Sequence, residues 1–137
     1  LAYVALSYPA GALSDRVRPR MILICGILVL IAGNLVLAET NNFVGLVIGT
    51  SLWGVHMALT QGIFSRMIAD SAPEELRATS FGAFYFVTGI GALLASLGAG
   101  WLWDRQGASA TFITSAAIAA VAVAMLALLP EERRPIV

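Results

Sequence analysis

Residues 11–38 read GALSDRVRPRMILICGILVLIAGNLVLA, a charged loop followed by a long uncharged run. The loop, Gly11–Arg20, contains four charged residues and a proline. As an α-helix, the run from Met21 to Ala38 would be roughly 27 Å long, close to the hydrocarbon thickness of a bilayer. This stretch therefore predicts a membrane-spanning helix that is entered from a charged loop.

The composition favours a membrane protein over the whole chain. It is 59% hydrophobic and 12% charged, whereas soluble domains are roughly 45–50% apolar and about 25% charged. Too little polar surface remains to cover a water-soluble globule. A single cysteine, Cys25, excludes a disulfide framework by count. No metal-ligand spacing or catalytic motif is found, so we expect no enzyme, no cofactor and no metal. No basic run with interleaved aromatic residues indicates nucleic-acid binding.

Further apolar runs follow the first, and they are continuous, unlike the alternating strands of a membrane barrel. Because lipid offers the backbone no water, such runs must be helical. The first run is shorter than the ~20 residues that a span needs, so we expect the chain to start inside a helix. The predicted fold is an all-α membrane protein, a bundle of four full transmembrane helices plus a truncated first helix. The expected helices cover approximately residues 1–14, 20–38, 43–66, 73–103 and 108–129, and a polar tail follows at 130–137.

Arginines give the bundle a direction, since successive loops lie on alternate sides of the membrane. One side has a single arginine, Arg105. The arginine-rich side should be cytoplasmic, and the C-terminal tail then lies there too. Trp101 and Trp103 fall at the opposite end of their span, where interfacial tryptophans are expected. The arginines on the basic side are Arg16, Arg18, Arg20, Arg66, Arg77, Arg133 and Arg134.

His56 is the ionisable residue that lies deep in an expected span. Trp53, His56 and Thr60 share one helix face by their i, i+3, i+7 spacing, and Gln61 lies on an adjacent face. An ionisable side chain in lipid is costly and is a candidate for function. Three interpretations stay open: His56 lines a solute cavity with these neighbours, it takes part in proton coupling, or it is a neutral histidine hydrogen-bonded to another helix.

Glycines form a strip on the fourth expected helix. Gly82 and Gly89 are seven residues apart, as are Gly91 and Gly98. Small residues at such spacing let two helices approach backbone to backbone in lipid. The strip predicts helix packing, either as a fixed contact or as one that slides during transport.

The motif Gly11-x-Leu13-Ser14-Asp15-Arg16, with Arg20, resembles the signature loop of the major facilitator superfamily. In that family the loop lies between helices 2 and 3 and recurs between helices 8 and 9. The segment 69–82 resembles the family's connector into an odd-numbered helix, and residues 98–107 resemble the end of helix 11 in bacterial members. The resemblance covers essentially the whole chain. It implies the end of helix 8 through helix 12 of a twelve-helix transporter, without its N-terminal half.

What the resemblance implies about function is transport of a small solute by alternating access. The signature's second glycine is Arg18 here, and the arginine after it is Pro19. Either Arg18 or Arg20 therefore replaces that arginine in the family's charge relay, or the relay is absent. Gln61 cannot titrate where some bacterial members have an acid. The inner gate implied by the resemblance consists of Gly11, Asp15, Arg16, Arg20, Asp70 and Arg77.

The expected partners are the lipid bilayer, the other half of the transporter and an unidentified small molecule. The expected location is the bacterial inner membrane. An alternative from another class is a non-transporting membrane fragment, a helix-packing assembly module. That alternative predicts that substitutions in the glycine strip impair the protein, whereas substitutions of His56 do not.

Overall fold

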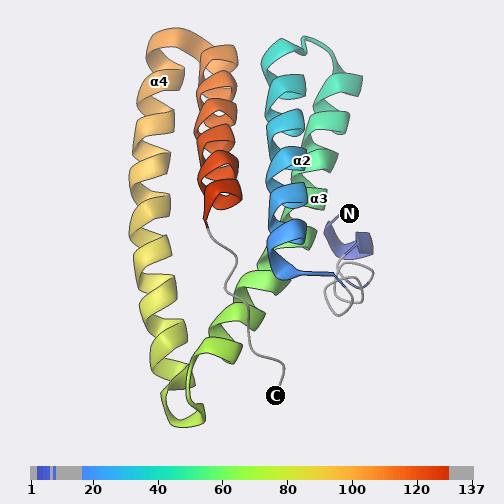
Figure 1. The fold of residues 1–137 in the computed structure, drawn as a ribbon. Coiled ribbons are helices and arrows are strands. Elements are labelled where there is room, and N and C mark those ends of the chain that lie inside the picture. The colour runs from blue at the N-terminus through green and yellow to red at the C-terminus, as the bar shows by residue number, and fades with distance from the viewer. Residues whose placement is uncertain (1–2, 7, 9–16, 130–137) are drawn as a thin grey trace.

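The computed structural model describes residues 3–6, 8 and 17–129. The gate residues Gly11, Asp15 and Arg16 and the tail at 130–137 lie outside the described residues. The described part is built from helices, in the order α2, α3, η1 and α4. Figure 1 shows α2, the upper part of α3 and the two halves of α4 as rods that run up and down, while the lower part of α3 slants toward the start of α4.

Helix α2 comprises Pro19–Glu39. Proline suits the first helical position, because its fixed φ is already helical and the N–H that it lacks would be unpaired there. At the other end, the backbone N–H of Thr40 donates to the carbonyl of Val36 at 3.0 Å. The helix therefore begins one residue before the expected position and ends one residue after it.

Helix α3 comprises Phe43–Ser71, which extends past the expected end at 66. Asn42 caps its start, because the side-chain oxygen accepts a hydrogen bond from the Gly45 backbone N–H at 2.8 Å. At the other end Ala72 is extended, as expected for a residue before a proline. The polar segment that contains Arg66 and Asp70 is thus helical and not a loop. The two residues are one helical turn apart, and their side chains form an ion pair at i, i+4.

Helix α4 comprises Arg77–Leu128 and is preceded by the short 3₁₀ helix η1, Glu74–Leu76. A straight helix of 52 residues would be about 78 Å long, more than twice the hydrocarbon thickness. It folds back on itself at Gly107, whose φ of 84° and ψ of 179° are non-helical and suit glycine. Figure 1 shows the two resulting arms side by side, here named the first arm (77–106) and the second arm (108–128). The rings of Trp103 and Phe112 meet edge to face across this turn, with centroids 5.9 Å apart.

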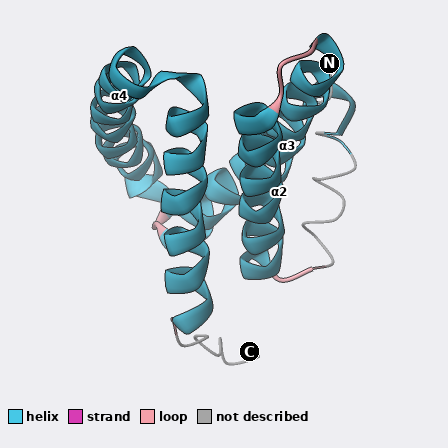
Figure 2. Cartoon of the chain, turned by 90° about the horizontal axis from the view of Figure 1, so that it is seen from above, coloured by secondary structure: helices cyan, strands magenta, loops and turns pink. Residues whose placement is uncertain are grey.

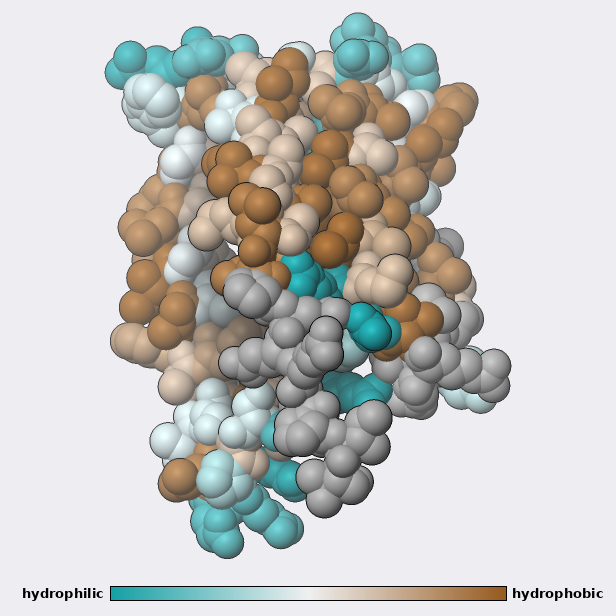
Figure 3. All heavy atoms as spheres, viewed as in Figure 1, coloured by the Kyte–Doolittle hydropathy of each residue, from teal (hydrophilic) through white to brown (hydrophobic). Residues whose placement is uncertain are grey.

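Within the described residues, three helices are long and apolar enough to cross a membrane: Pro19–Glu39, Phe43–Ser71 and the bent Glu74–Leu128. Figure 3 shows apolar residues over the middle of one face and polar residues near its two ends. The chain is therefore helical and apolar over membrane-spanning lengths, as its composition predicts.

Helix α2 lies between α3 and the second arm, as Figures 1 and 2 both show. Its buried residues Ile22 and Leu23 form a small core with Ile63 of α3. Leu126 of the second arm packs against this core. The first arm contributes little to it, and most of its residues are exposed. Three helical segments thus share one core, and the first arm stands outside it.

Glycines make the contact between α2 and α3 close. A Cβ atom on Gly33 would lie 3.2 Å from the carbonyl oxygen of Gly49, and one on Gly26 would lie 2.7 Å from the Thr60 methyl group. This is the backbone-to-backbone approach that small residues allow in lipid. By contrast, no described atom lies within 4 Å of the Cβ position of any strip glycine. The strip glycines are Gly82, Gly89, Gly91 and Gly98.

We predict that Gly26→Ala destabilises the protein, because the added methyl group meets Thr60 in the interface. Overpacking of this kind costs about 1–3 kcal/mol. Gly62→Ala is the matched control, since Gly62 is in α3 and no described atom lies within 4 Å of its Cβ position. Thermal unfolding of the purified protein in detergent should show a lower midpoint for Gly26→Ala and an equal or higher midpoint for Gly62→Ala. Equal midpoints for Gly26→Ala and the wild type would contradict the prediction.

Candidate functional site

A buried amide connects the three helical segments that share the core. The Asn34 side chain in α2 is 0% exposed. Its Oδ1 accepts a hydrogen bond from Nε1 of Trp53 in α3 at 3.0 Å. Its Nδ2 donates to Oγ of Ser115 in the second arm at 3.1 Å. Both ends of the amide are therefore satisfied, each by a different helix.

His56 also faces α2. Its Nδ1 lies 2.9 Å from the carbonyl oxygen of Gly26. Since a carbonyl only accepts, Nδ1 must have the hydrogen and Nε2 is the remaining ring nitrogen. The structure thus contains the hydrogen bond to a neighbouring helix that one interpretation of the sequence requires. This bond leaves Nε2 available for a second partner, so it does not decide between the three interpretations.

Thr60 completes the side of α3 that faces α2. Its side chain is 4% exposed, and its hydroxyl donates to the His56 carbonyl at 2.9 Å. Its methyl group occupies the space beside Gly26. Trp53, His56 and Thr60 therefore lie along the contact between the two helices. Gly26 and Gly33 of α2 have no side chains there, which makes room for them.

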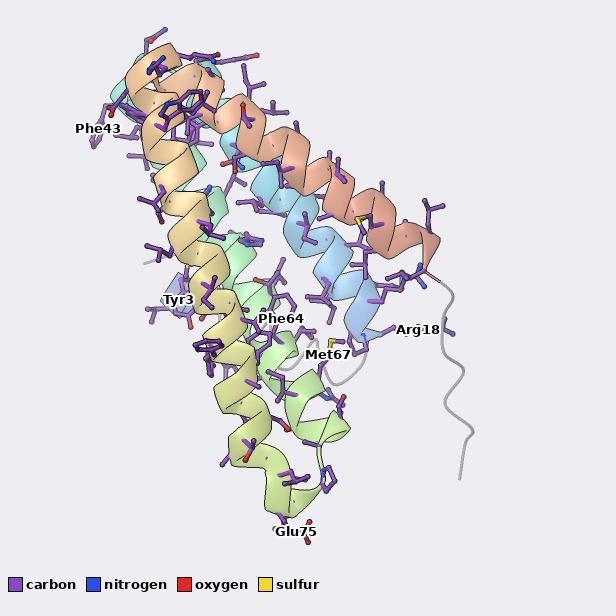
Figure 4. All side chains as sticks on the ribbon, turned by 90° about the vertical axis from the view of Figure 1, so that its left-hand side faces the viewer. Tyr3, Arg18, Phe43, Phe64, Met67 and Glu75 are labelled. Atoms are coloured by element: carbon purple, nitrogen blue, oxygen red, sulfur yellow. The ribbon has the colours of Figure 1, made fainter. Side chains whose placement is uncertain are left out.

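Gln61 lies on another side of the same helix. At 100° per residue it is rotated by about 140° from His56. The hydroxyl of Tyr3 donates to Oε1 of Gln61 at 3.3 Å. Tyr3 belongs to the helical residues 3–6, which lie beside α3 in Figure 4. The structure thus separates the four candidates into three residues that contact α2 and one that contacts the start of the chain.

Of the expected gate residues in the described part, Arg20 and Asp70 have partners outside that set. A terminal nitrogen of the Arg20 guanidinium donates to the carbonyl of Ala127 at 2.7 Å. This carbonyl belongs to the last turn of α4, where carbonyls have no partner within the helix. Asp70 pairs with Arg66 at 3.8 Å, and both side chains are nearly half exposed. Arg77 is exposed at the start of α4. The described contacts thus join the signature loop to the end of α4.

Sequence reasoning missed an apolar groove of about 350 Å³ at the α3–α4 connection. The rings of Phe64 and Phe84 meet there with centroids 6.0 Å apart, and Figure 4 shows Phe64 and Met67 on the part of α3 that approaches α4. The signal in the sequence was the i, i+3, i+4, i+7 spacing of the α3 residues, which continues past the expected helix end. The residues that line the groove are Phe64, Met67, Ile68, Ser71, Ala72, Ser80 and Phe84.

No group of three or more metal-ligating side chains occurs among residues 3–6, 8 and 17–129. The polar groups of the candidate site are instead amide, imidazole, indole and hydroxyl groups. Such groups bind by hydrogen bonds and stacking.

Comparison with known proteins decides the family. The family model of the Major Facilitator Superfamily matches residues 1–137. The chain belongs to this superfamily. It is 32% identical over 124 residues to an uncharacterized MFS-type transporter of Methanocaldococcus jannaschii, covering 90% of this chain and 31% of the relative. It is 26% identical over 132 residues to the MFS-type transporter ppzB of Metarhizium rileyi, covering 96% of this chain and 27% of that relative.

This superfamily chain spans less than a third of the length of those two relatives. No solved structure matches it. Family membership confirms the sequence resemblance and supports membrane transport. It also points to a transporter rather than an enzyme.

We predict that Arg20→Ala loosens the end of α4, because the last-turn carbonyl of Ala127 loses its cationic partner. A cation at a helix C-terminus contributes about 0.3–1 kcal/mol. Hydrogen–deuterium exchange of the purified protein should be faster in the last turn of α4 and unchanged near Gly107. Arg20→Lys is the control, since it keeps the charge and should restore part of the protection. Unchanged exchange in Arg20→Ala would show that this contact does not hold the helix end.

Proposed function

We propose that the chain is the C-terminal part of a secondary transporter that moves a small solute by alternating access. It would comprise the end of helix 8 through helix 12 of a twelve-helix transporter. The two arms of α4 would then be separate spans, which gives four full spans and one truncated helix. The observation that supports this most strongly is the match of the superfamily model over residues 1–137.

The proposed orientation places the arginine-rich ends in the cytoplasm of a bacterial cell, with the protein in the inner membrane. The basis is the arginine bias of the loops. Figure 4 shows Arg18 and Glu75 away from the end of the molecule that has Phe43. On this orientation the turn at Gly107 faces outward. Arg105 beside it stacks on Trp101, with its guanidinium carbon 5.5 Å from the ring centroid. The single outer arginine is thus held against an interfacial aromatic ring.

We assign the solute cavity to the side of α3 that includes Gln61. Gln61 is exposed and near Tyr3, so two polar side chains from two helices meet there. Trp53 is 43% exposed and would add part of its ring to the edge of this cavity. His56 and Thr60 would act mainly through their contacts with α2. A direct role of His56 in proton coupling would use Nε2.

The upstream half would cover the exposed first arm and its glycine strip. A helix that is apolar on every face needs either lipid or other helices around it. The open space at Gly82, Gly89, Gly91 and Gly98 would accept a closely packed helix on one side. The same open strip is what the alternative, a helix-packing assembly module, would use.

We predict that Asp15→Asn impairs transport and leaves the amount of protein in the membrane largely unchanged. The substitution removes the negative charge that Asp15 contributes to the proposed inner gate and keeps the side-chain volume. Untargeted metabolite profiling of cells that express the wild type, and of cells that express the variant, should show solutes whose cellular level changes only with the wild type. Identical profiles at equal expression would contradict the proposed gate.

We predict that a cysteine at position 61 reacts with a membrane-impermeant maleimide, because the proposed solute cavity would bring water to this position inside the membrane. The test uses Gln61→Cys in a Cys25→Ser background, since Cys25 is exposed. Thr60→Cys is the matched control on the buried side of the same helix turn, and it should remain unlabelled. Labelling from both sides of the membrane would agree with alternating access. An unreactive Gln61→Cys variant would place this side of α3 against lipid or protein and would remove the proposed cavity.

A further inference from the structure

The direction of the Asn34 amide is fixed by its neighbours. The indole N–H of Trp53 can only donate, so the atom opposite it must be Oδ1. Nδ2 then points to Ser115, whose hydroxyl oxygen must accept. A flipped amide would oppose two donors at 3.0 Å. Since Asn34 is 0% exposed, water cannot replace a lost partner, and a broken bond would leave a buried polar group unsatisfied.

The Trp53 ring is held by α2 at two places. Asn34 accepts from its N–H edge. Beside it, the Cβ position of Gly33 is 3.5 Å from Cδ1 of the ring, so the bare backbone of Gly33 provides a surface for the pyrrole side. Part of the residue stays accessible, since Trp53 as a whole is 43% exposed. The hydrogen bond to Asn34 is therefore the directional contact that orients the indole.

We propose that Asn34 is a positioning residue for Trp53, with Ser115 behind it. The amide holds the indole by its N–H and aims the exposed part of the ring at the solute path. This rests on the proposed function, in which Trp53 borders the cavity. It assigns a functional role to a residue that does not itself reach the cavity, and it extends the site from α3 through α2 to the second arm of α4.

The hydrogen bond also limits what Trp53 offers to a solute. Because Asn34 uses the indole N–H, the ring meets a solute with its face and its benzene edge only. A held ring also loses no rotational freedom when a solute arrives, which lowers the entropic cost of binding. Trp53 thus contributes rigid contact area rather than a hydrogen bond.

The experiment uses the full-length protein labelled with 5-fluorotryptophan, in lipid nanodiscs, with Trp53→Phe to identify the Trp53 fluorine signal. Asn34→Leu removes the acceptor at similar volume and should shift and broaden that signal. Asn34→Asp keeps an oxygen acceptor at the same position, so it should retain the wild-type signal. The fluorine signals of Trp101 and Trp103 are internal controls and should not move. An unshifted Trp53 signal in Asn34→Leu would overturn the positioning role.

A second variant covers the case in which Asn34→Leu does not fold. Ser115→Ala removes the anchor of Nδ2 and leaves the bond to Trp53 in place. It should shift the Trp53 signal in the same direction by a smaller amount. No shift in this variant would show that the second arm does not act through Asn34.

Iodide quenching separates this inference from the proposed function. Its probe is aqueous iodide, and the Trp53 contribution is the fluorescence difference between the protein and its Trp53→Phe variant. Quenching of Trp53 is expected if its ring borders a water-filled cavity. No quenching in the wild type would remove Trp53 from the solute path and overturn the functional part of both proposals. Quenching in the wild type with no fluorine shift in Asn34→Leu would overturn the role of Asn34 alone.

Discussion

The buried amide of Asn34 is the constraint that fixes how the helices of this chain are arranged. It lies in α2, and its two ends bond to Trp53 in α3 and Ser115 in the second arm of α4. In an apolar interior an amide cannot remain unpaired without cost. Sliding or rotating any of the three segments would break one of these bonds. The apolar side chains around them can pack in several registers, whereas the amide is satisfied in one.

Close approach of α2 and α3 makes this geometry available. Gly33 and Gly49 face each other, with a hypothetical Cβ on Gly33 only 3.2 Å from the Gly49 carbonyl oxygen. At this separation His56 reaches the backbone of α2 directly and bonds the Gly26 carbonyl. Larger residues at these glycines would separate the helices and leave the imidazole and indole N–H groups without acceptors. In lipid, where apolar burial gives helices little reason to associate, van der Waals contact and interhelical hydrogen bonds supply the specificity.

Much of the fold could be predicted from the sequence, because it depends on local chemistry. Pro19 predicts a helix start, and Pro73 and Gly107 predict breaks, from backbone geometry alone. The apolar runs give the helices themselves. The far end of α3 was missed because the charges of Arg66 and Asp70 indicate a loop in a hydropathy profile, although their i, i+4 spacing is helical.

The partners of the candidate residues could not be predicted in the same way. Helix spacing places Trp53, His56 and Thr60 on one face, but it does not say which neighbour that face meets. That depends on the glycines of α2, whose importance appears only when α2 and α3 are paired. The strip on α4 has more glycines, yet no described atom of another segment lies within 4 Å of the Cβ positions of its members. A pattern of small residues shows where a helix can approach and not which helix does.

Arginine near the start of α2 can serve two needs, a charge pair with an acid or a cation at the end of a helix. The signature loop contains arginines that the sequence resemblance suggested for a gate. In the structure Arg20 bonds the last turn of α4 at 2.7 Å, where unpaired carbonyls and the helix dipole favour a cation. The partner of Asp70 is instead Arg66, one turn earlier in α3. Pro19 begins α2 where the family has an arginine, so Arg20 is placed in the first turn of that helix and directed toward the second arm. In this structure Arg20 therefore contributes to the stability of the bundle, because it holds the end of α4.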